Sequence, residues 1–237
     1  MNFLKKKVVL ITTGGTIAST RNDKNKLESG KLDGQAILSM CQLENDIDIE
    51  LIDLYQIPSM HMTFENLNHL NKTITKVFQD PSVSGIVVTH GTDSLEETAY
   101  FLELTLYDER PVIVTGSQKS PEDIGTDVYS NLRNSLLVAS SDEAKNIGIC
   151  VVFNEKILHS KYVKKTHSSS INGFGAIGYG MLGFIDNDEV VIYQKPTHKE
   201  VYPIKESYPT VEIVFAYLGA GSIILDALYE ADIEGII

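Results

Sequence analysis

Several threonines and lysines of this chain lie beside short apolar runs, where a hydroxyl or an amine could take part in proton transfer. Thr16 belongs to the segment TTGGTIAS, residues 12–19, in which two glycines follow an apolar run. Consecutive glycines allow a sharp turn and let a ligand approach bare backbone. The segment lacks the GxGxxG pattern and the Gly-Lys-Ser/Thr ending of phosphate-binding loops. It therefore predicts either a simple tight turn or a turn that presents the hydroxyl of Thr16.

A second polar group follows a later apolar run, at His90-Gly91-Thr92-Asp93-Ser94. The first amides of a helix have no intrahelical partner, so they favour negative charge, including the charge that develops on an oxyanion. Threonine and aspartate are also good helix caps. The segment predicts either a capped helix start or a site in which a hydroxyl lies beside a carboxylate.

A third group combines lysines with hydroxyls at Lys161-Tyr162-Val163-Lys164-Lys165-Thr166-His167. A lysine can accept a proton when burial or a neighbouring cation lowers its pKa. The alternative interpretation is a basic loop in water. His61 and His167 do not have zinc-site spacing, and Cys41 and Cys150 have no CxxC partner. We therefore expect no metal site, no disulfide framework and a reducing compartment.

The elements that must position these groups are short apolar strands alternating with helical segments. Strands are expected at 8–12, 49–55, 86–89, 112–115 and 147–153, and helices at 33–41, 64–78, 94–106 and 128–139. Strands without polar alternation, separated by helices, are typical of a parallel sheet covered by helices on both faces, so the predicted fold class is α/β. Ligands bind at the carboxyl ends of such strands. The loops expected there begin at Thr13, Pro58, His90 and Gly116.

Two helices carry start signals, and the later part of the chain is less regular. Thr63 is expected to cap the second helix, and Ser94 with Glu97 fits a capping box for the third. Residues 156–209 show no clear period apart from a hairpin-like stretch at 186–188. A strand at 212–217 and a helix at 222–231 follow.

This pattern predicts an N-terminal domain at 1–190, a linker at 191–209, and at 210–237 the beginning of a smaller, incomplete α/β domain. A piece of that size cannot bury a core of its own. The apolar side chains expected to be uncovered there include Ile213, Val214, Phe215 and Leu225. We therefore expect the chain to aggregate when it is expressed alone.

The formal net charge of -12 bears on the classes of partner. A negative chain is repelled by phosphate backbones and anionic lipid, so we expect no nucleic-acid and no membrane partner. The apolar run at 8–11 is shorter than the roughly seven residues that a signal-peptide core needs. The sequence therefore predicts a cytoplasmic protein.

Taken together and in this order, the polar segments resemble the bacterial L-asparaginase family. TTGGTIAS and VVTHGTDSLEETAYFLELTL, residues 87–106, resemble the two signature regions of that family. PVIVTGSQ and KYVKKTH follow at matching intervals. The resemblance runs from about Lys7 to the last residue, and the coincidence of two signatures is highly specific.

The resemblance implies a catalytic group made of Thr16, Thr92, Asp93 and Lys165. Thr16 would attack the side-chain amide carbon of the substrate, and Lys165, oriented by Asp93, would draw a proton through Thr92. Which threonine forms the covalent bond stays open at this point, with Thr16 favoured. The family's chemistry needs neither a metal nor a cofactor.

The resemblance also implies how the substrate is held. Ser59 would bind the α-carboxylate, with Met60 beside it, and Asp93 would pair with the α-ammonium group. Backbone N–H groups near Thr92 and Ser117 would stabilise the oxyanion.

The chain departs from the family in three places. A lid tyrosine is absent from residues 19–30, and Leu27 stands at the corresponding position. Met60 and His61 stand where polar and acidic residues are common. Family members also run further, through a C-terminal domain that completes the site of a neighbouring subunit. We therefore expect a homo-oligomer, a dimer or a homotetramer, when that domain is complete.

The expected activity is hydrolysis of L-asparagine, with L-glutamine as a second candidate substrate. The alternative is an asparaginase-like protein that binds an amino acid or a partner chain without turnover. The absent tyrosine favours the alternative. The relay lysine favours an enzyme, because binding alone does not require a proton acceptor. A tRNA-dependent amidotransferase subunit would carry an extra N-terminal domain, and a racemase relative would need paired cysteines at the site.

Overall fold

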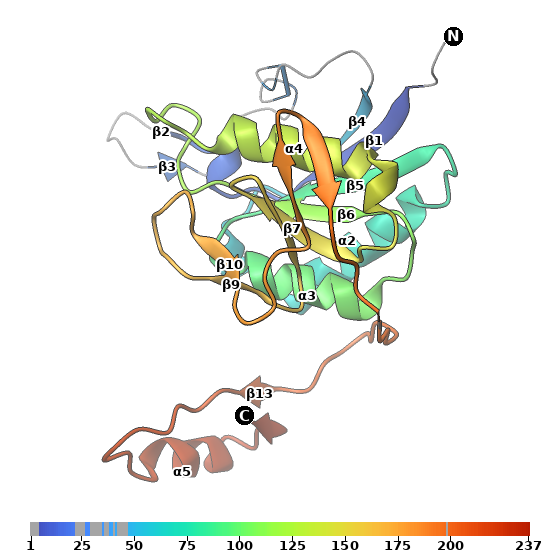
Figure 1. Cartoon of the computed structure of the whole chain (residues 1–237). Helices are drawn as coiled ribbons and strands as arrows, with labels where there is room; N and C mark the ends of the chain where they lie inside the picture. Colours follow the sequence, from blue (N-terminus) through green and yellow to red (C-terminus); the bar gives the residue numbers. More distant parts are fainter. Residues whose placement is uncertain are drawn as a thin grey trace. The chain divides into compact units, whose positions relative to one another are not determined.

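The computed structural model describes residues 5–21, 27–28, 35, 38–39, 41, 47–197 and 199–237. The helix expected at 33–41 lies largely outside these residues. Contacts divide the chain into two compact units, Met1–Pro203 and Ile204–Ile237, and each unit is described by itself (Figure 1). No helix among the described residues is long and apolar enough to cross a bilayer.

The first unit is built on an eight-stranded sheet with the order β12-β11-β8-β7-β6-β5-β1-β4. Its strands are β1 (Lys6–Thr12), β4 (Ile47–Asp53), β5 (Val83–Thr89), β6 (Val112–Thr115), β7 (Ile149–Phe153), β8 (Lys156–His159), β11 (Gly183–Asp186) and β12 (Glu189–Ile192). The half from β4 to β7 is parallel, as the sequence predicts. The three remaining strands continue the sheet in antiparallel fashion.

Two tight turns produce this antiparallel half. Asn187 and Asp188 both have positive φ, 46° and 67°, between β11 and β12. This is the pattern of a type I′ hairpin turn and confirms the hairpin expected at 186–188. Asn154 and Glu155 form a similar turn between β7 and β8, with φ of 49° and 65°. The sequence analysis did not predict this second hairpin.

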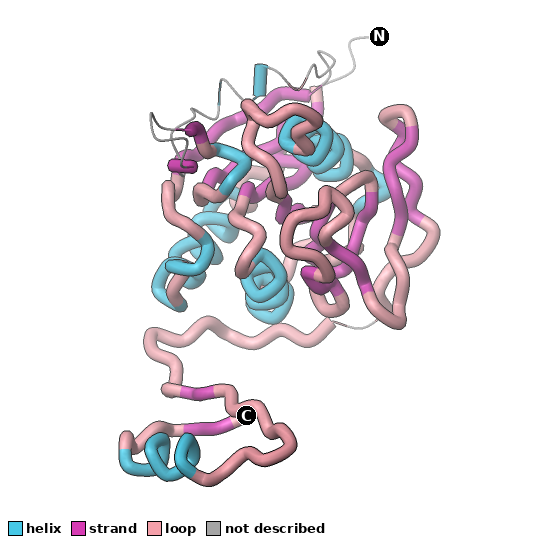
Figure 2. The backbone as a smooth tube through the Cα atoms, turned by 90° about the vertical axis from the view of Figure 1, so that its left-hand side faces the viewer, coloured by secondary structure: helices cyan, strands magenta, loops and turns pink. Residues whose placement is uncertain are grey.

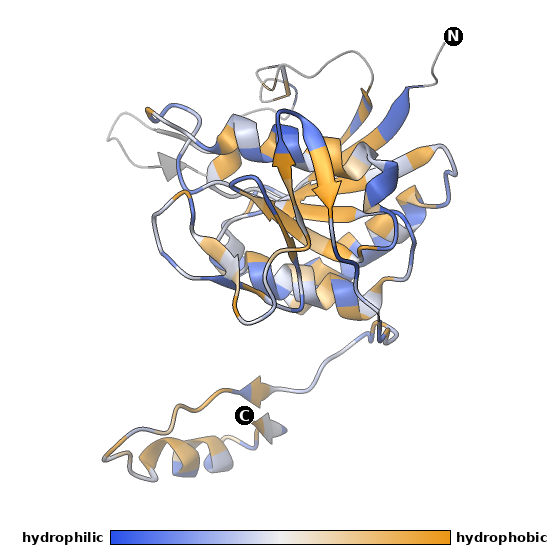
Figure 3. Ribbon diagram, in the orientation of Figure 1, coloured by the Kyte–Doolittle hydropathy of each residue, from blue (hydrophilic) through white to orange (hydrophobic). Residues whose placement is uncertain are grey.

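Three helices cover the sheet: α2 (Phe64–Val77), α3 (Leu95–Thr105) and α4 (Val128–Ser140). Alternate side chains of a strand point to opposite faces. Val8 and Leu10 of β1 accordingly pack in the core that includes α4, whereas Val9 and Ile11 pack in the core that includes α2 and α3. Figures 1 and 2 show helices on both sides of the sheet, and Figure 3 shows its apolar strands between them. The predicted fold class is confirmed.

Of the two helix caps expected from the sequence, one is present and one is not. Thr63 caps α2 and forms a reciprocal capping box with Asn66. The capping box expected at Ser94 and Glu97 is wrong, because Ser94 makes no side-chain cap bond. Its hydroxyl donates to the carbonyl of Ser59 at 2.6 Å instead, so a tertiary contact replaces the local one.

Several short elements complete the first unit. The 3-10 helices are η1 (Thr16–Ala18), η2 (Ser59–His61) and η3 (Asp142–Ala144), and two separate antiparallel pairs are β2 (Thr20–Arg21) with β3 (Leu27–Glu28) and β9 (Val163–Lys165) with β10 (Phe174–Ala176). The sequence analysis did not predict the β9–β10 pair. Three-residue strands are too short to show a hydrophobic period. Its anchors are Val163 and Phe174, which are buried on the side of the sheet covered by α2 and α3.

The second unit contains β13 (Val211–Glu212), α5 (Ile223–Glu230) and β14 (Gly235–Ile236). The strand expected at 212–217 is only two residues long, because β14 pairs with no more than that. Ile213, Phe215 and Leu225 are exposed, as the sequence predicts. Val214, expected to be uncovered as well, is half-buried.

Candidate active site

The carboxyl ends of three neighbouring strands bring the predicted loops to one edge of the sheet. Thr12, at the end of β1, pairs with Thr89 of β5, and Thr89 pairs with Thr115 of β6. The loops that follow these strands therefore begin at the same level. The segment after β4 joins them, because Ile57 donates its amide to the carbonyl of Thr13 at 3.2 Å.

The loop after β1 presents Thr16 beside the loop after β5. Gly14 and Gly15 have φ of 107° and 87°, which non-glycine residues rarely adopt. A Cβ atom on Gly15 would lie 2.5 Å from the backbone nitrogen of Gly91, so only glycine fits. Thr16, the first residue of η1, is half-buried and directly follows this contact.

Ser59 lies in η2 against the same loop. Its side chain is buried, and its Oγ accepts a hydrogen bond from the backbone amide of Asp93 at 3.2 Å. A Cβ atom on Gly91 would lie 2.6 Å from this Oγ. Among the described residues, the hydroxyl of Ser59 donates to no acceptor, so it can donate to a ligand. Met60, the next residue, has 68% of its surface exposed and has no polar side-chain atom with which to bind one.

Lys165 joins the third predicted group to the second. It ends β9, and its Nζ donates to Thr92 Oγ1 at 2.8 Å and pairs with Asp93 Oδ1 at 2.8 Å. Thr92 is buried, whereas the Asp93 side chain is 59% exposed. A hydroxyl within 2.8 Å of an amine is close enough for direct proton transfer. The exposed carboxylate of Asp93 faces solvent, from which a ligand can enter.

Glu96, in the first turn of α3, holds the main chain of Lys165. Its Oε2 accepts the backbone N–H of Lys165, and its Oε1 pairs with Lys164 Nζ at 2.7 Å. Glu96 was not among the site residues expected from the sequence. No local signal could have found it, because it lies in the first turn of an expected helix and its partner Lys165 follows 69 residues later.

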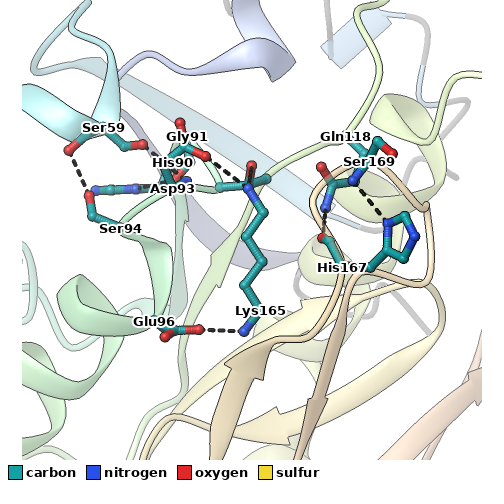
Figure 4. A network of polar contacts seen from close by, with 11 residues as sticks. Ser59, His90, Gly91, Asp93, Ser94, Glu96, Gln118, Lys165, His167 and Ser169 are labelled. Carbon is teal, nitrogen blue, oxygen red and sulfur yellow. Dashed lines mark hydrogen bonds and ion pairs between the residues drawn. The ribbon is translucent and has the colours of Figure 1, made fainter. Parts of the chain in front are cut away.

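Ser117 follows β6, and its side chain is turned back into its own loop. It is buried, and its Oγ donates to the carbonyl of Lys119 at 2.7 Å. A Cβ atom on Gly116 would lie 2.4 Å from the carbonyl oxygen of His90 and 3.5 Å from Cγ2 of Thr92. The loop is thus packed directly against the Thr92 loop. The amide of Gln118 also reaches the carbonyl of His167 at 3.5 Å (Figure 4).

Two buried residues that the sequence analysis missed fix this loop. The carboxylate of Asp127 accepts the backbone amides of Gln118 and Lys119, both at 3.0 Å. The side-chain amide of Asn131 donates to the carbonyl of Gly116 at 3.0 Å and to Asp127 at 3.0 Å. They lie one turn apart at the start of α4. The sequence shows this spacing, but it does not show which loop the two side chains bind.

His90 is a structural residue of the site. Burial lowers its pKa to about 4, so its ring is neutral at physiological pH. Nδ1 lies 2.8 Å from the carbonyl oxygen of Gly91, and Nε2 lies 2.9 Å from the hydroxyl of Thr98. These contacts tie the glycine loop to α3.

Other positions considered from the sequence are the possible metal ligands, the two cysteines and Leu27. No group of three or more histidine, cysteine, aspartate or glutamate side chains that could hold a metal occurs among the described residues. Cys41 and Cys150 are buried and form no disulfide. Leu27 belongs to β3, but its side chain lies outside the described residues.

Comparisons with known proteins agree on one family. The family model described as "Asparaginase, N-terminal" matches residues 7–198. The chain is 48% identical to an L-asparaginase of Bacillus licheniformis over 99% of this chain and 73% of that protein. It is 32% identical to a probable periplasmic L-asparaginase of Haemophilus influenzae over 97% and 68%.

A solved structure gives the same result. The crystal structure of a probable cytoplasmic L-asparaginase from Campylobacter jejuni superposes with a TM-score of 0.88 and 33% identity, over 98% of this chain and 73% of that one. The chain spans between 63% and 73% of the length of the first curated relatives that it matches.

Proposed function

This chain belongs to the asparaginase family of amidohydrolases, and from that membership we propose that it hydrolyses L-asparagine to L-aspartate and ammonia. One observation of the site carries the proposal. Lys165 Nζ lies 2.8 Å from both the hydroxyl of Thr92 and the carboxylate of Asp93. A protein that only binds an amino acid does not need an amine in contact with a buried hydroxyl.

Thr16 is proposed as the nucleophile. It is half-buried beside bare glycine backbone, whereas Thr92 is buried and already paired with Lys165. The Oγ of Thr16 forms a bond to the side-chain amide carbon of the substrate as its proton leaves. Because a threonine hydroxyl is a poor nucleophile, this step needs a base. Lys165 supplies that base through the hydroxyl of Thr92.

The remaining steps return the site to its starting state. The tetrahedral intermediate breaks its carbon–nitrogen bond, and the nitrogen takes up a proton and leaves as ammonia. Water then attacks the resulting β-aspartyl ester, the ester carbon–oxygen bond breaks, and Thr16 regains its proton. Backbone N–H groups of the Thr92 and Ser117 loops are the proposed oxyanion donors, a contribution of about 2.7–4 kcal/mol for one donor in a comparable site.

The substrate is proposed to bind through its charged ends. The hydroxyl of Ser59 can donate to the α-carboxylate, with Met60 exposed beside it. Asp93 Oδ1 contacts Lys165, and its other oxygen has no partner among the described residues, so it can receive the α-ammonium group. We further propose that the protein is cytoplasmic, that it forms a dimer or a tetramer, and that L-glutamine is a second substrate.

The test is ammonia release from L-asparagine by the purified chain. The parent is compared with Thr92→Val, which keeps the shape of the side chain but removes the hydroxyl, and with Lys165→Met. Lys72→Met is the control, because Lys72 is an exposed lysine of α2 that has no part in the proposed site. Turnover in the parent and in the control, with loss in the other two, supports the proposal.

Two outcomes would contradict it. No ammonia from the parent, together with calorimetric binding of L-asparagine, would favour a binding protein. Equal turnover in the parent and in Thr92→Val would show that the roles are wrongly assigned.

A further inference from the structure

Lys165 reaches the site from a hairpin that does not belong to the main sheet. β9 and β10 form a separate two-stranded sheet, and among the described strands they pair only with each other. No ladder of hydrogen bonds to the eight-stranded sheet therefore fixes where Lys165 lies. Burial of Val163 and Phe174 holds the hairpin on the core, but apolar packing is not directional. Something else must set the position of Lys165 relative to Thr92.

Glu96 supplies that directional contact. Its two carboxylate oxygens have separate partners, the backbone N–H of Lys165 and the ammonium group of Lys164 at 2.7 Å. Its side chain is only 13% exposed, so water screens these contacts less than on an open surface. Hydrogen bonds to an ionised acceptor are about twice as strong as neutral ones.

The same short segment of chain therefore holds both ends of Lys165. Thr92 and Asp93 immediately precede α3 and contact Nζ, while Glu96 in the first turn of α3 contacts the main-chain nitrogen. Figure 4 shows the Lys165 side chain running from Glu96 at its backbone end to Asp93 at its amine. A long side chain anchored at both ends has few conformations left, which lowers the entropy lost in reaching a reactive geometry.

We propose that Glu96 is a positioning residue, whose carboxylate fixes the backbone of Lys165 so that its amine meets Thr92 and Asp93. The inference rests on the proposed function of Lys165 as the base. Glu96 does not touch the substrate in this scheme and acts only through Lys165. Its loss should therefore lower kcat, because Lys165 acts in the chemical step. KM should change little, because Ser59 and Asp93 hold the substrate.

The test compares three variants with the parent. In Glu96→Ala the clamp is lost, and kcat is expected to fall by about 100-fold, with KM changed by less than about threefold. Glu96→Gln keeps an oxygen that can accept the Lys165 N–H, so it is expected to recover most of kcat. Glu97→Ala removes the neighbouring exposed glutamate and is expected to match the parent. Thermal melts of all variants report whether the fold is kept.

A second measurement does not depend on activity. Trace acetylation with acetic anhydride, followed by mass spectrometry, reports how accessible each lysine amine is. Lys165, with a side chain 19% exposed, is expected to react slowly relative to the exposed Lys72, and faster in Glu96→Ala than in the parent. Glu97→Ala should leave this ratio unchanged.

The outcomes separate the two proposals. If the parent releases no ammonia, the proposed function fails, while the acetylation ratio still decides whether Glu96 positions Lys165. Unchanged kcat and unchanged acetylation in Glu96→Ala would overturn the inference and leave the proposed function standing. A Glu96→Gln variant as inactive as Glu96→Ala would also overturn it, because the charge and not the clamp would then be needed.

Discussion

Gly15 and Gly91 meet backbone to backbone, and a Cβ atom on Gly15 would lie 2.5 Å from the nitrogen of Gly91. Each glycine directly precedes a threonine, Thr16 in one loop and Thr92 in the other. The contact therefore sets how closely the two hydroxyl-bearing loops approach each other. Both loops leave parallel strands at the same level, so the sheet brings the glycines together and the missing side chains let them touch.

Gly15→Ala should separate these loops. The added methyl group would collide with backbone that cannot move aside, and φ of 87° is unfavourable for alanine. We expect a loss of kcat/KM of about 100-fold or more and a loss of stability of about 1–3 kcal/mol. Ammonia release and urea unfolding measure the two effects.

Gly178→Ala is the control for this change. Gly178 has a similar φ of 84°, but a Cβ atom there would meet nothing within 4 Å. The Gly178→Ala variant introduces backbone strain without a collision. Its activity should therefore stay near that of the parent. Similar activity in both alanine variants would contradict the role given to the Gly15–Gly91 contact.

Asp127→Asn should loosen the loop that carries Ser117. The carboxylate accepts the backbone amides of Gln118 and Lys119, and an amide group in its place offers one acceptor oxygen where two were used. We expect a loss of about 1–3 kcal/mol in unfolding free energy, because either a part-buried backbone N–H group or the buried side-chain amide of Asn131 loses its acceptor. kcat should fall as well, because the proposed oxyanion donor moves. Asp186→Asn, at an exposed hairpin, is the control for both measurements.

The pH dependence of stability has a source far from the proposed site. Burial lowers the pKa of His159 to about 4, together with smaller contributions from the charges of Lys199 and Lys161. Its Nε2 lies 3.7 Å from Glu103 and has no hydrogen-bond partner among the described residues. Because the ring is neutral at neutral pH, the two side chains do not form an ion pair there. Because the unfolded histidine, with a pKa near 6.5, binds a proton more readily than the folded one, stability should fall as pH drops from about 6.5 to 4.

The loss of unfolding free energy from His159 is at most about 3 kcal/mol, because each pKa unit corresponds to about 1.4 kcal/mol. His90 acts in the same direction, because burial also lowers its pKa to about 4. Glu103 has the opposite effect on stability just above pH 4.5. Burial raises its pKa, so its carboxyl binds a proton more readily in the folded state than in the unfolded state. His159→Gln should flatten the decline in unfolding free energy between pH 7 and 5. An equal slope in this variant and in the parent would rule out His159 as the cause.

The sequence alone determined the parallel core and the place of the proposed site within it. Apolar runs such as Val112–Thr115 recur between helical segments, and a strand buried on both faces has to be apolar throughout. Thr63 as a cap and the turn at Asn187–Asp188 were also predictable, because their partners lie within a few residues. The two family signatures then assigned Thr16 and Thr92 to their loops.

Only the tertiary structure decided which distant groups meet. Ser94 was expected to be a local cap but bonds to Ser59, and Glu96, in the first turn of the expected helix, holds Lys165. Asp127 and Asn131 could likewise be placed at the start of a helix from the sequence, but the loop that they bind could not be identified. Local signals depend on neighbours a few residues apart, whereas these contacts depend on how the sheet orders its strands, which no single segment encodes.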